Sequence, residues 1–120
     1  MRSHDLGREA ERFAAEHLQS LGYTIIVQNY RTPLGEIDIV ARDGDVLVFV
    51  EVKARGDEGV DPLEAVDRRK QQRIIRIARM YLASELGRED VLSRFDVLAV
   101  RRSSAGELKA ELIKDAFQVS

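Results

Sequence analysis

The chain has 120 residues, of which 44% are hydrophobic and 33% are charged, and this length and composition suit one globular domain over residues 1–120. Its formal net charge of −2, from 19 basic and 21 acidic residues, excludes a uniformly basic nucleic-acid coat protein but allows a local basic patch. The absence of cysteine excludes disulfides, thiol catalysis and cysteine-ligated metal centres, and the longest apolar run, Val46–Val50, is too short to cross a bilayer.

Hydrophobic periodicity predicts a helix followed by three strands in the first half of the chain. The helix shows one apolar stripe and stops at Gly22, whereas the strands are rich in β-branched and aromatic residues. The pair Asp43-Gly44, between the second and third strands, is typical of a two-residue hairpin turn. These elements are expected at residues 4–21 for the helix and 23–27, 37–42 and 46–53 for the strands, with a loop at 29–35.

The second half of the chain is predicted to hold a long helix and two more strands. The helix is expected from residue 67 to about 86, where Gly87 ends it, and the strands are expected at 95–100 and 108–112. The strand at 46–53 is apolar on both faces, as is typical of a central strand, and its long helical connection favours parallel pairing by a right-handed crossover. We therefore expect an α/β fold with the core order α-β-β-β-α-β, in which helices cover both faces of a mixed sheet.

Acidic side chains gather at one end of the predicted hairpin. Because side chains alternate along a strand, Glu51 and Lys53 share one face at the end of the central strand. With the two-residue turn described above, Asp38 lies opposite Phe49. The same register places Glu36 opposite Glu51, so the sequence predicts three carboxylates and one lysine on a single face.

Such a group of carboxylates requires positive charge nearby. Two carboxylates ~4 Å apart repel by on the order of 4 kcal/mol at an effective dielectric constant of 20. Lys53 offsets one charge, whereas a hard divalent cation, Mg²⁺ or Mn²⁺ rather than zinc, offsets more and suits oxygen ligands. Two plainer alternatives stay open: Glu51 and Lys53 form a structural ion pair, and Glu36 is simply solvated after Gly35.

Two short motifs around these residues resemble the PD-(D/E)XK nuclease motif. They are Gly35-Glu36-Ile37-Asp38 and Phe49-Val50-Glu51-Val52-Lys53, with Ile37 where the superfamily name has a proline. The expected element order also resembles that superfamily's restriction-endonuclease-like core. From about residue 7 to 117 the chain is similar to the YraN-like bacterial family, within the Holliday-junction-resolvase-like nucleases. The motifs that carry this resemblance are Gly7-Arg8-Glu9, Asn29-Tyr30-Arg31, GEIDIV, FVEVKAR, Lys70-Gln71, Arg94-Phe95-Asp96-Val97 and Ala116-Phe117.

The resemblance implies a metal-dependent active site. Lys53 would orient or deprotonate the attacking water, and Gln71 matches a polar helix residue that approaches the site in related nucleases. Gln71 also interrupts an otherwise apolar helix stripe, which is unusual for a purely structural residue. Glu9 has a plain alternative as a solvated helix carboxylate. The implied metal ligands are Asp38, Glu51, the backbone carbonyl of Val52 and Glu9, and the implied cofactor is Mg²⁺ or Mn²⁺.

The helix expected at residues 67–86 carries a local excess of positive charge. It holds six basic and two acidic residues, a net +4 within a chain of net −2. Arg69, Arg73 and Arg76 share one face by helical spacing, and such a stripe suits phosphate contacts that do not depend on sequence. Little aromatic surface is expected for base stacking, which favours duplex or branched DNA over single strands. The alternative to a phosphate-binding role is that these arginines form an ordinary solvated helix face. The predicted nucleic-acid contacts are Arg69, Lys70, Arg73, Arg76, Arg55 and Arg31.

Together these features favour a cytoplasmic, Mg²⁺- or Mn²⁺-dependent endonuclease that acts on DNA and has no membrane partner. A homodimer is consistent with the resemblance, because resolvase-like relatives are often dimers. Two other functions stay open: a nucleic-acid-binding protein of the same fold without significant cleavage, and a structural or interaction domain. Metal binding would separate the first two functions from the third.

Overall fold

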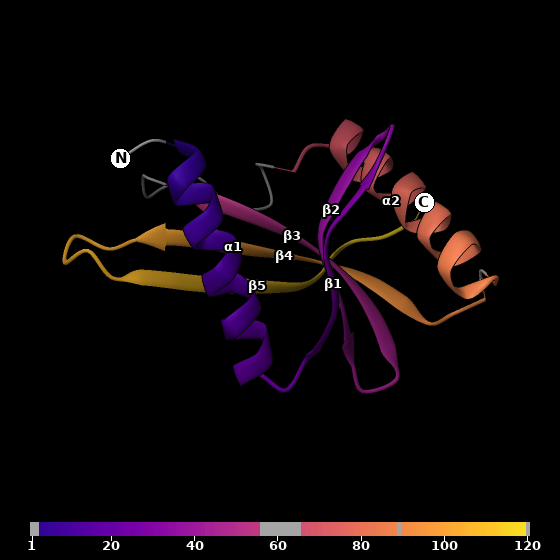
Figure 1. Ribbon diagram of the computed structural model, residues 1–120, viewed down its shortest axis with the longest axis horizontal. Coiled ribbons are helices and arrows are strands. Elements are labelled where there is room, and N and C mark those ends of the chain that lie inside the picture. The colour runs from indigo at the N-terminus through magenta and orange to yellow at the C-terminus, as the bar shows by residue number, and fades with distance from the viewer. Residues whose placement is uncertain (1–2, 56–65, 89, 120) are drawn as a thin grey trace.

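The computed structural model describes residues 3–55, 66–88 and 90–119, and of these the side chains of residues 3–6 and 55 lie outside the description. Helices and strands follow one another in the predicted order (Figure 1). Among the described residues, no helix is long and apolar enough to span a membrane. The elements are α1 (Ser3–Ser20), β1 (Thr24–Thr32), β2 (Gly35–Asp43), β3 (Val46–Arg55), α2 (Arg68–Tyr81), the π-helical turn η2 (Leu82–Leu86), β4 (Ser93–Arg102) and β5 (Leu108–Phe117).

The strands form a mixed five-stranded sheet in the order β1-β2-β3-β4-β5. Neighbouring strands are antiparallel except for β3 and β4, which are parallel and are connected through α2. The parallel pairing predicted from the long helical connection is therefore confirmed, as is the mixed α/β sheet flanked by helices. The β1–β2 hairpin twists away from the rest of the sheet and extends beside α2 (Figure 1).

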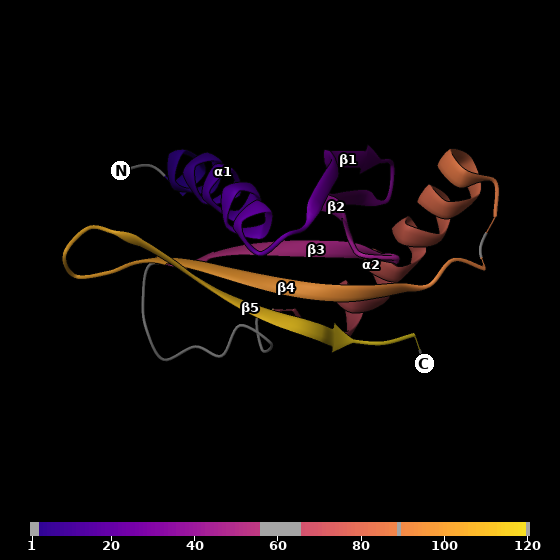
Figure 2. The ribbon, with the colours of Figure 1, turned by 90° about the horizontal axis from the view of Figure 1, so that it is seen from below.

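Two apolar clusters cover opposite faces of the sheet. Leu47 and Phe49 of β3 pack in one cluster with Ile77 of α2. Val48 and Val50, which alternate with them, pack in the other cluster on the side of α1. Because alternate residues of a strand point to opposite faces, β3 is buried on both sides, as its apolar sequence predicts. Figure 2 shows α1 above one end of the sheet and α2 at the other end.

Strand β1 continues through residues that the sequence predicts to be a loop. It runs to Thr32, and a two-residue turn at 33–34 leads directly into β2. Asn29 adopts a left-handed φ of 57° within the strand, whereas the loop was predicted from the composition of residues 29–35, which include Pro33. The ring of Tyr30 packs edge-to-face on Tyr81 of α2, with centroids 5.1 Å apart. Packing against α2 thus keeps this segment in the sheet despite its turn-forming residues.

The turn between β2 and β3 lies one residue later than predicted. Asp43 pairs with Val46, so Gly44-Asp45, rather than Asp43-Gly44, forms the turn. Gly44 has a φ of 61°, and a type II′ turn requires a positive φ at its first central position, which glycine adopts without steric cost. The predicted turn was therefore wrong by one residue, and each pairing in the hairpin shifts with it.

The β4–β5 pairing contains a bulge around Asp96. Residues 114–116 of β5 face this single residue of β4, because the register of the two strands shifts there. Asp115 lies in the bulge with a left-handed φ of 54°, and its backbone N–H donates to Oδ1 of Asp96 at 2.9 Å. The fully buried Asp96 carboxylate therefore replaces the ladder partner that the bulge removes.

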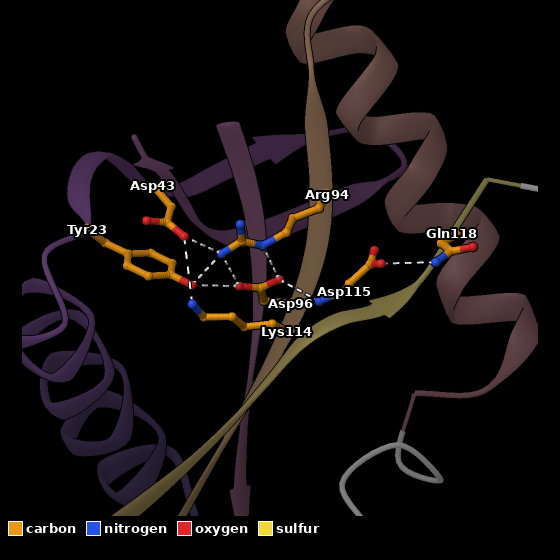
Figure 3. A network of polar contacts seen from close by, with 7 residues as sticks. All are labelled: Tyr23, Asp43, Arg94, Asp96, Lys114, Asp115 and Gln118. Carbon is orange, nitrogen blue, oxygen red and sulfur yellow. Dashed lines mark hydrogen bonds and ion pairs between the residues drawn. The ribbon is translucent and has the colours of Figure 1, made fainter. Parts of the chain in front are cut away.

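Asp96 is also the centre of a polar network that connects distant parts of the chain (Figure 3). Arg94 Nε donates to Oδ1 of Asp96 at 3.0 Å, and Arg94 Nη2 donates to Oδ2 of Asp43 at 2.9 Å. The Tyr23 hydroxyl donates to Oδ2 of Asp96 at 3.1 Å, and burial, with the nearby Asp96 charge, raises the pKa of Tyr23 to about 12. The network joins the start of β1 and the end of β2 to the β4–β5 hairpin, which gives the Arg94-Phe95-Asp96-Val97 motif a structural role.

Candidate active site

The site forms where β2 separates from β3. The pairing of β2 with β3 extends from the hairpin turn to Ile39 and Val50, whereas β2 remains paired with β1 as far as Gly35. At the point of separation, the backbone N–H of Val52 donates to Oδ2 of Asp38 at 2.8 Å. A side-chain carboxylate thus takes the place of a backbone acceptor, and from Asp38 toward Gly35 the two strands diverge.

The corrected register brings Asp38 and Glu51 closer than the sequence predicts. The prediction that Asp38 lies opposite Phe49 was wrong, because the turn is displaced; continuing the observed register places Asp38 opposite Glu51. The predicted shared face is unaffected, since residues 49 and 51 point the same way along β3. Both carboxylates line one pocket of about 420 Å³, together with Lys53, Lys70 and other residues of β2 and α2.

Both carboxylates in this pocket are buried, Asp38 with 9% and Glu51 with 7% of its surface exposed. Burial, followed by the negative charge of Glu51, raises the pKa of Asp38 to about 8. The hydrogen bond from Val52 acts in the opposite direction but does not outweigh these effects. Asp38 therefore keeps its proton near neutral pH unless a cation enters, and a cation bound beside it would replace that proton.

Two lysines neutralise Glu51. Lys70 Nζ lies 2.7 Å from Oε2 of Glu51, and Lys53 Nζ lies 3.5 Å from the same oxygen. Burial and the neighbouring Lys70 ammonium lower the pKa of Lys53. Burial acts to lower the pKa of Lys70, but the hydrogen bonds with Glu51 and Lys53 and the charges of the two carboxylates together outweigh it, so the net direction is upward. Lys70, which is predicted from the sequence as a nucleic-acid contact, therefore lies in the pocket and contacts Glu51.

The structure does not bring Glu9 to these carboxylates. Its carboxylate accepts a hydrogen bond from Arg102 Nη2 at 2.6 Å, at the end of β4. Another acidic residue of α1, Glu11, lies near enough for its charge to raise the pKa of Asp38. Across the described ranges, no group of three or more acidic or histidine side chains could hold a metal ion. The candidate metal site is therefore the pair Asp38 and Glu51, with Glu11 as a more distant negative charge.

Gln71 has a structural contact. Its amide Nε2 donates to the backbone carbonyl of Val66 at 2.9 Å, which fixes the buried residue before α2. This hydrogen bond explains why a polar side chain interrupts the apolar stripe of the helix. The structure brings Asp38, Glu51 and Lys53 together but gives Gln71 no described contact with them.

The predicted DNA-contacting residues fall into separate groups. Arg69 and Arg76 are exposed on α2, and Arg73 is exposed at the pocket wall. Arg31, on the β1–β2 hairpin, pairs with Glu36 at 3.4 Å, so Glu36 is an exposed ion-pair partner at the rim. The side chain of Arg55, at the end of β3, lies outside the described residues. The basic face of α2, defined here as Arg69, Arg73 and Arg76, is therefore adjacent to the carboxylate pocket.

Gly35 brings this basic face close to the hairpin. It has a φ of 138°, and a Cβ at this position would lie 3.5 Å from Ile77 Cδ1 and 3.6 Å from Arg73 Cδ. The backbone conformation is what requires glycine here, because a Cβ at these distances would only make ordinary van der Waals contact with α2. The close approach forms one wall of the pocket.

The donor set fits a hard divalent cation. Magnesium sites commonly use one or two carboxylates and complete their coordination with water and substrate phosphates. The Asp38–Glu51 pair supplies two such carboxylates in a pocket that also contains basic side chains. Burial and the Glu51 charge raise the pKa of Asp38, so a cation bound between the two carboxylates would replace the Asp38 proton.

The fold and the pocket define the class of protein: a mixed α/β protein whose central strand ends in a buried acidic pair neutralised by lysines. The chain belongs to the uncharacterised protein family UPF0102, whose family model matches residues 10–100. The resemblance to the YraN-like family is thereby confirmed.

Relatives similar to this chain over nearly its whole length come from several bacteria. A UPF0102 protein of Symbiobacterium thermophilum is 48% identical over 116 residues, which cover 96% of this chain and 98% of the relative. A UPF0102 protein of Desulforapulum autotrophicum is 51% identical over 115 residues, covering 94% and 93%. One from Dictyoglomus thermophilum is 40% identical over 120 residues, covering 98% and 100%.

Proposed function

We propose that the protein is a divalent-metal-dependent nuclease that hydrolyses phosphodiester bonds in duplex or branched DNA. The observation that carries this proposal is the pairing of Asp38 with Glu51 in one pocket, with Lys53 beside Glu51. The resemblance of the two motifs to the PD-(D/E)XK pattern supports the same assignment, and so does the adjacent basic face of α2.

The residues divide the chemistry between them. Asp38 and Glu51 would hold Mg²⁺ or Mn²⁺, with the backbone carbonyl of Val52 as a further ligand in the proposed set. The metal, when bound, would lower the pKa of water and neutralise charge on the phosphoryl oxygens. Lys53, whose pKa is lowered by burial and by Lys70, is suited to accept a proton from water or to donate a hydrogen bond to a phosphate oxygen.

The basic face of α2 supports binding of the DNA backbone. Its arginines are exposed, and Arg73 also lines the pocket, so a phosphate chain held on the helix would continue toward Asp38 and Glu51. Phosphate contacts of this kind fix the position of the DNA without reading its sequence. This arrangement favours selection by DNA structure rather than by base sequence.

A cleavage panel tests the proposal. Linear, nicked, flapped and four-way DNA are incubated with the protein and Mg²⁺ or Mn²⁺, alongside Asp38→Asn, Lys53→Ala and Asp45→Asn. The last variant removes an exposed carboxylate at the far end of the same hairpin and is the control. We expect metal-dependent cleavage products from wild type and the control. The cleavage rate of the other two variants should be at least about 100-fold lower. Binding without products on every substrate would contradict the proposal and support the non-cleaving alternative.

A further inference from the structure

Cations from two different elements hold the Glu51 carboxylate. Lys70 of α2 makes the shorter contact, 2.7 Å, which is typical of a charge-assisted hydrogen bond, and Lys53 of β3 makes the longer one, 3.5 Å. Both lysine side chains are largely shielded from solvent, with 27% and 20% of their surface exposed. Lys70 thus occupies a position from which a bound cation would neutralise Glu51.

Counting charges shows that the pocket is crowded once a metal enters. Asp38 and Glu51 supply two negative charges at most, and two ammonium groups already contact the Glu51 carboxylate before any metal is bound. A divalent ion adds two further positive charges, so one ammonium must move away from the carboxylates. Lys53 is fixed two residues from Glu51 on the same strand, whereas Lys70 reaches in from α2 on a long side chain that can turn aside.

We propose that Lys70 is a tethered competitor of the metal: its ammonium holds Glu51 in the metal-free protein and must be displaced when a divalent cation binds. This inference rests on the proposed function, because it concerns the same pocket. The displaced ammonium remains in the pocket wall beside Arg73. Metal entry therefore leaves an excess of positive charge there, which DNA phosphates would neutralise, so metal and DNA favour each other's binding.

Binding of Mn²⁺ to the DNA-free full chain tests the inference by calorimetry. Lys70→Met keeps the length of the side chain and removes its charge, Lys70→Arg keeps the charge, and Arg68→Met removes a charge from the exposed first turn of the same helix. We expect Lys70→Met to bind Mn²⁺ at least about tenfold more tightly than wild type, because the competing cation is gone. Arg68→Met and Lys70→Arg should stay within about threefold of wild type.

The outcomes distinguish this inference from the proposed function. If wild type binds Mn²⁺ and Asp38→Asn does not, while Lys70→Met binds no more tightly than Arg68→Met, the competitor role is refuted and the metal site stands. If neither wild type nor Lys70→Met binds Mn²⁺, both proposals fail. If Lys70 had only a structural role, replacing it would weaken Mn²⁺ binding. Tighter Mn²⁺ binding is therefore a result that only competition explains.

A second measurement uses the unaltered chain in case Lys70→Met does not fold. Mg²⁺ is titrated into the wild-type protein while the carbon and proton signals next to the lysine Nζ atoms are followed by NMR. We expect the Lys70 signals to shift with the same midpoint as Mg²⁺ binding, because the ion pair with Glu51 is broken. Saturation with Mg²⁺ that leaves these signals unchanged would overturn the inference.

Discussion

Replacing Asp38 by asparagine tests whether the buried carboxyl is protonated when no metal is bound. The amide oxygen keeps an acceptor for the Val52 N–H, whereas the charge facing Glu51 is removed. At low pH the protonated Asp38 resembles the amide, and at high pH it becomes a buried anion next to another anion. We therefore expect Asp38→Asn to match the wild-type stability at pH 5 and to exceed it at pH 8 in metal-free buffer.

The sign and size of this effect follow from the pKa of Asp38, which is raised from 3.8 to about 8. Between these values the folded state holds a proton that the unfolded state releases, so the free energy of unfolding of the wild type falls as pH rises. The loss through this group is up to about 1.4 kcal/mol per pH unit, or about 4 kcal/mol from pH 5 to 8. The lysines at Glu51 and relaxation of the pocket reduce this loss of stability. We therefore expect Asp38→Asn to be about 2 kcal/mol more stable than wild type at pH 8.

Urea unfolding in the presence of a chelator, at pH 5, 6, 7 and 8, measures the effect. Asp45→Asn on the hairpin turn is the control, and its difference from wild type should not vary with pH in the same way. Asp38→Ala should be about 1–3 kcal/mol less stable than Asp38→Asn at every pH, because the Val52 N–H loses its acceptor. A difference between Asp38→Asn and wild type that stays constant from pH 5 to 8 would refute the reasoning.

Three further predictions concern residues around the site. Replacing Arg69, Arg73 and Arg76 together by alanine should weaken duplex binding and lower the log–log salt slope by about 0.9 per lost phosphate contact, as measured by mobility shift; an unchanged slope would show a solvated face. Asp96→Ala should cost about 3–5 kcal/mol in urea unfolding, because a partly buried guanidinium and a backbone N–H lose their acceptor; a loss below 1 kcal/mol would argue against the network. Gln71→Ala should cost about 1 kcal/mol of stability and leave cleavage nearly intact; lost cleavage at unchanged stability would place Gln71 in the chemistry.

Local patterns in the sequence predict most of the fold. Apolar periodicity predicts α1, α2 and the two central strands, and the fully apolar pattern of β3 predicts its burial on both faces. The extension of β1 to Thr32 could not be read in this way. It depends on Tyr30 packing against Tyr81, a contact between residues far apart in the chain. The predicted hairpin register was wrong because two overlapping glycine-containing turns, with Asp43-Gly44 or Gly44-Asp45 at the centre, fit the sequence, and the choice between them determines every pair.

The candidate site was predictable where it depends on strand alternation and not where it depends on tertiary contacts. Alternation alone places Asp38, Glu51 and Lys53 on one face, even with the register in error. Lys70 reaches Glu51 from α2, but the sequence predicts it only as a nucleic-acid contact, because helical periodicity does not show which side chain points into a pocket. Glu11 was overlooked in favour of Glu9 for the same reason, since their spacing on α1 does not show which faces Asp38.

The hydrogen bond between Val52 and Asp38 makes one backbone amide a spectroscopic reporter of the site. The N–H of Val52 donates to a side-chain oxygen whose charge changes with protonation or metal binding. Its proton chemical shift should therefore change when Asp38 loses its proton and again when the carboxylate binds a cation. A single assigned amide signal would thus report pH titration and metal binding at the candidate site without a substrate that must be cleaved.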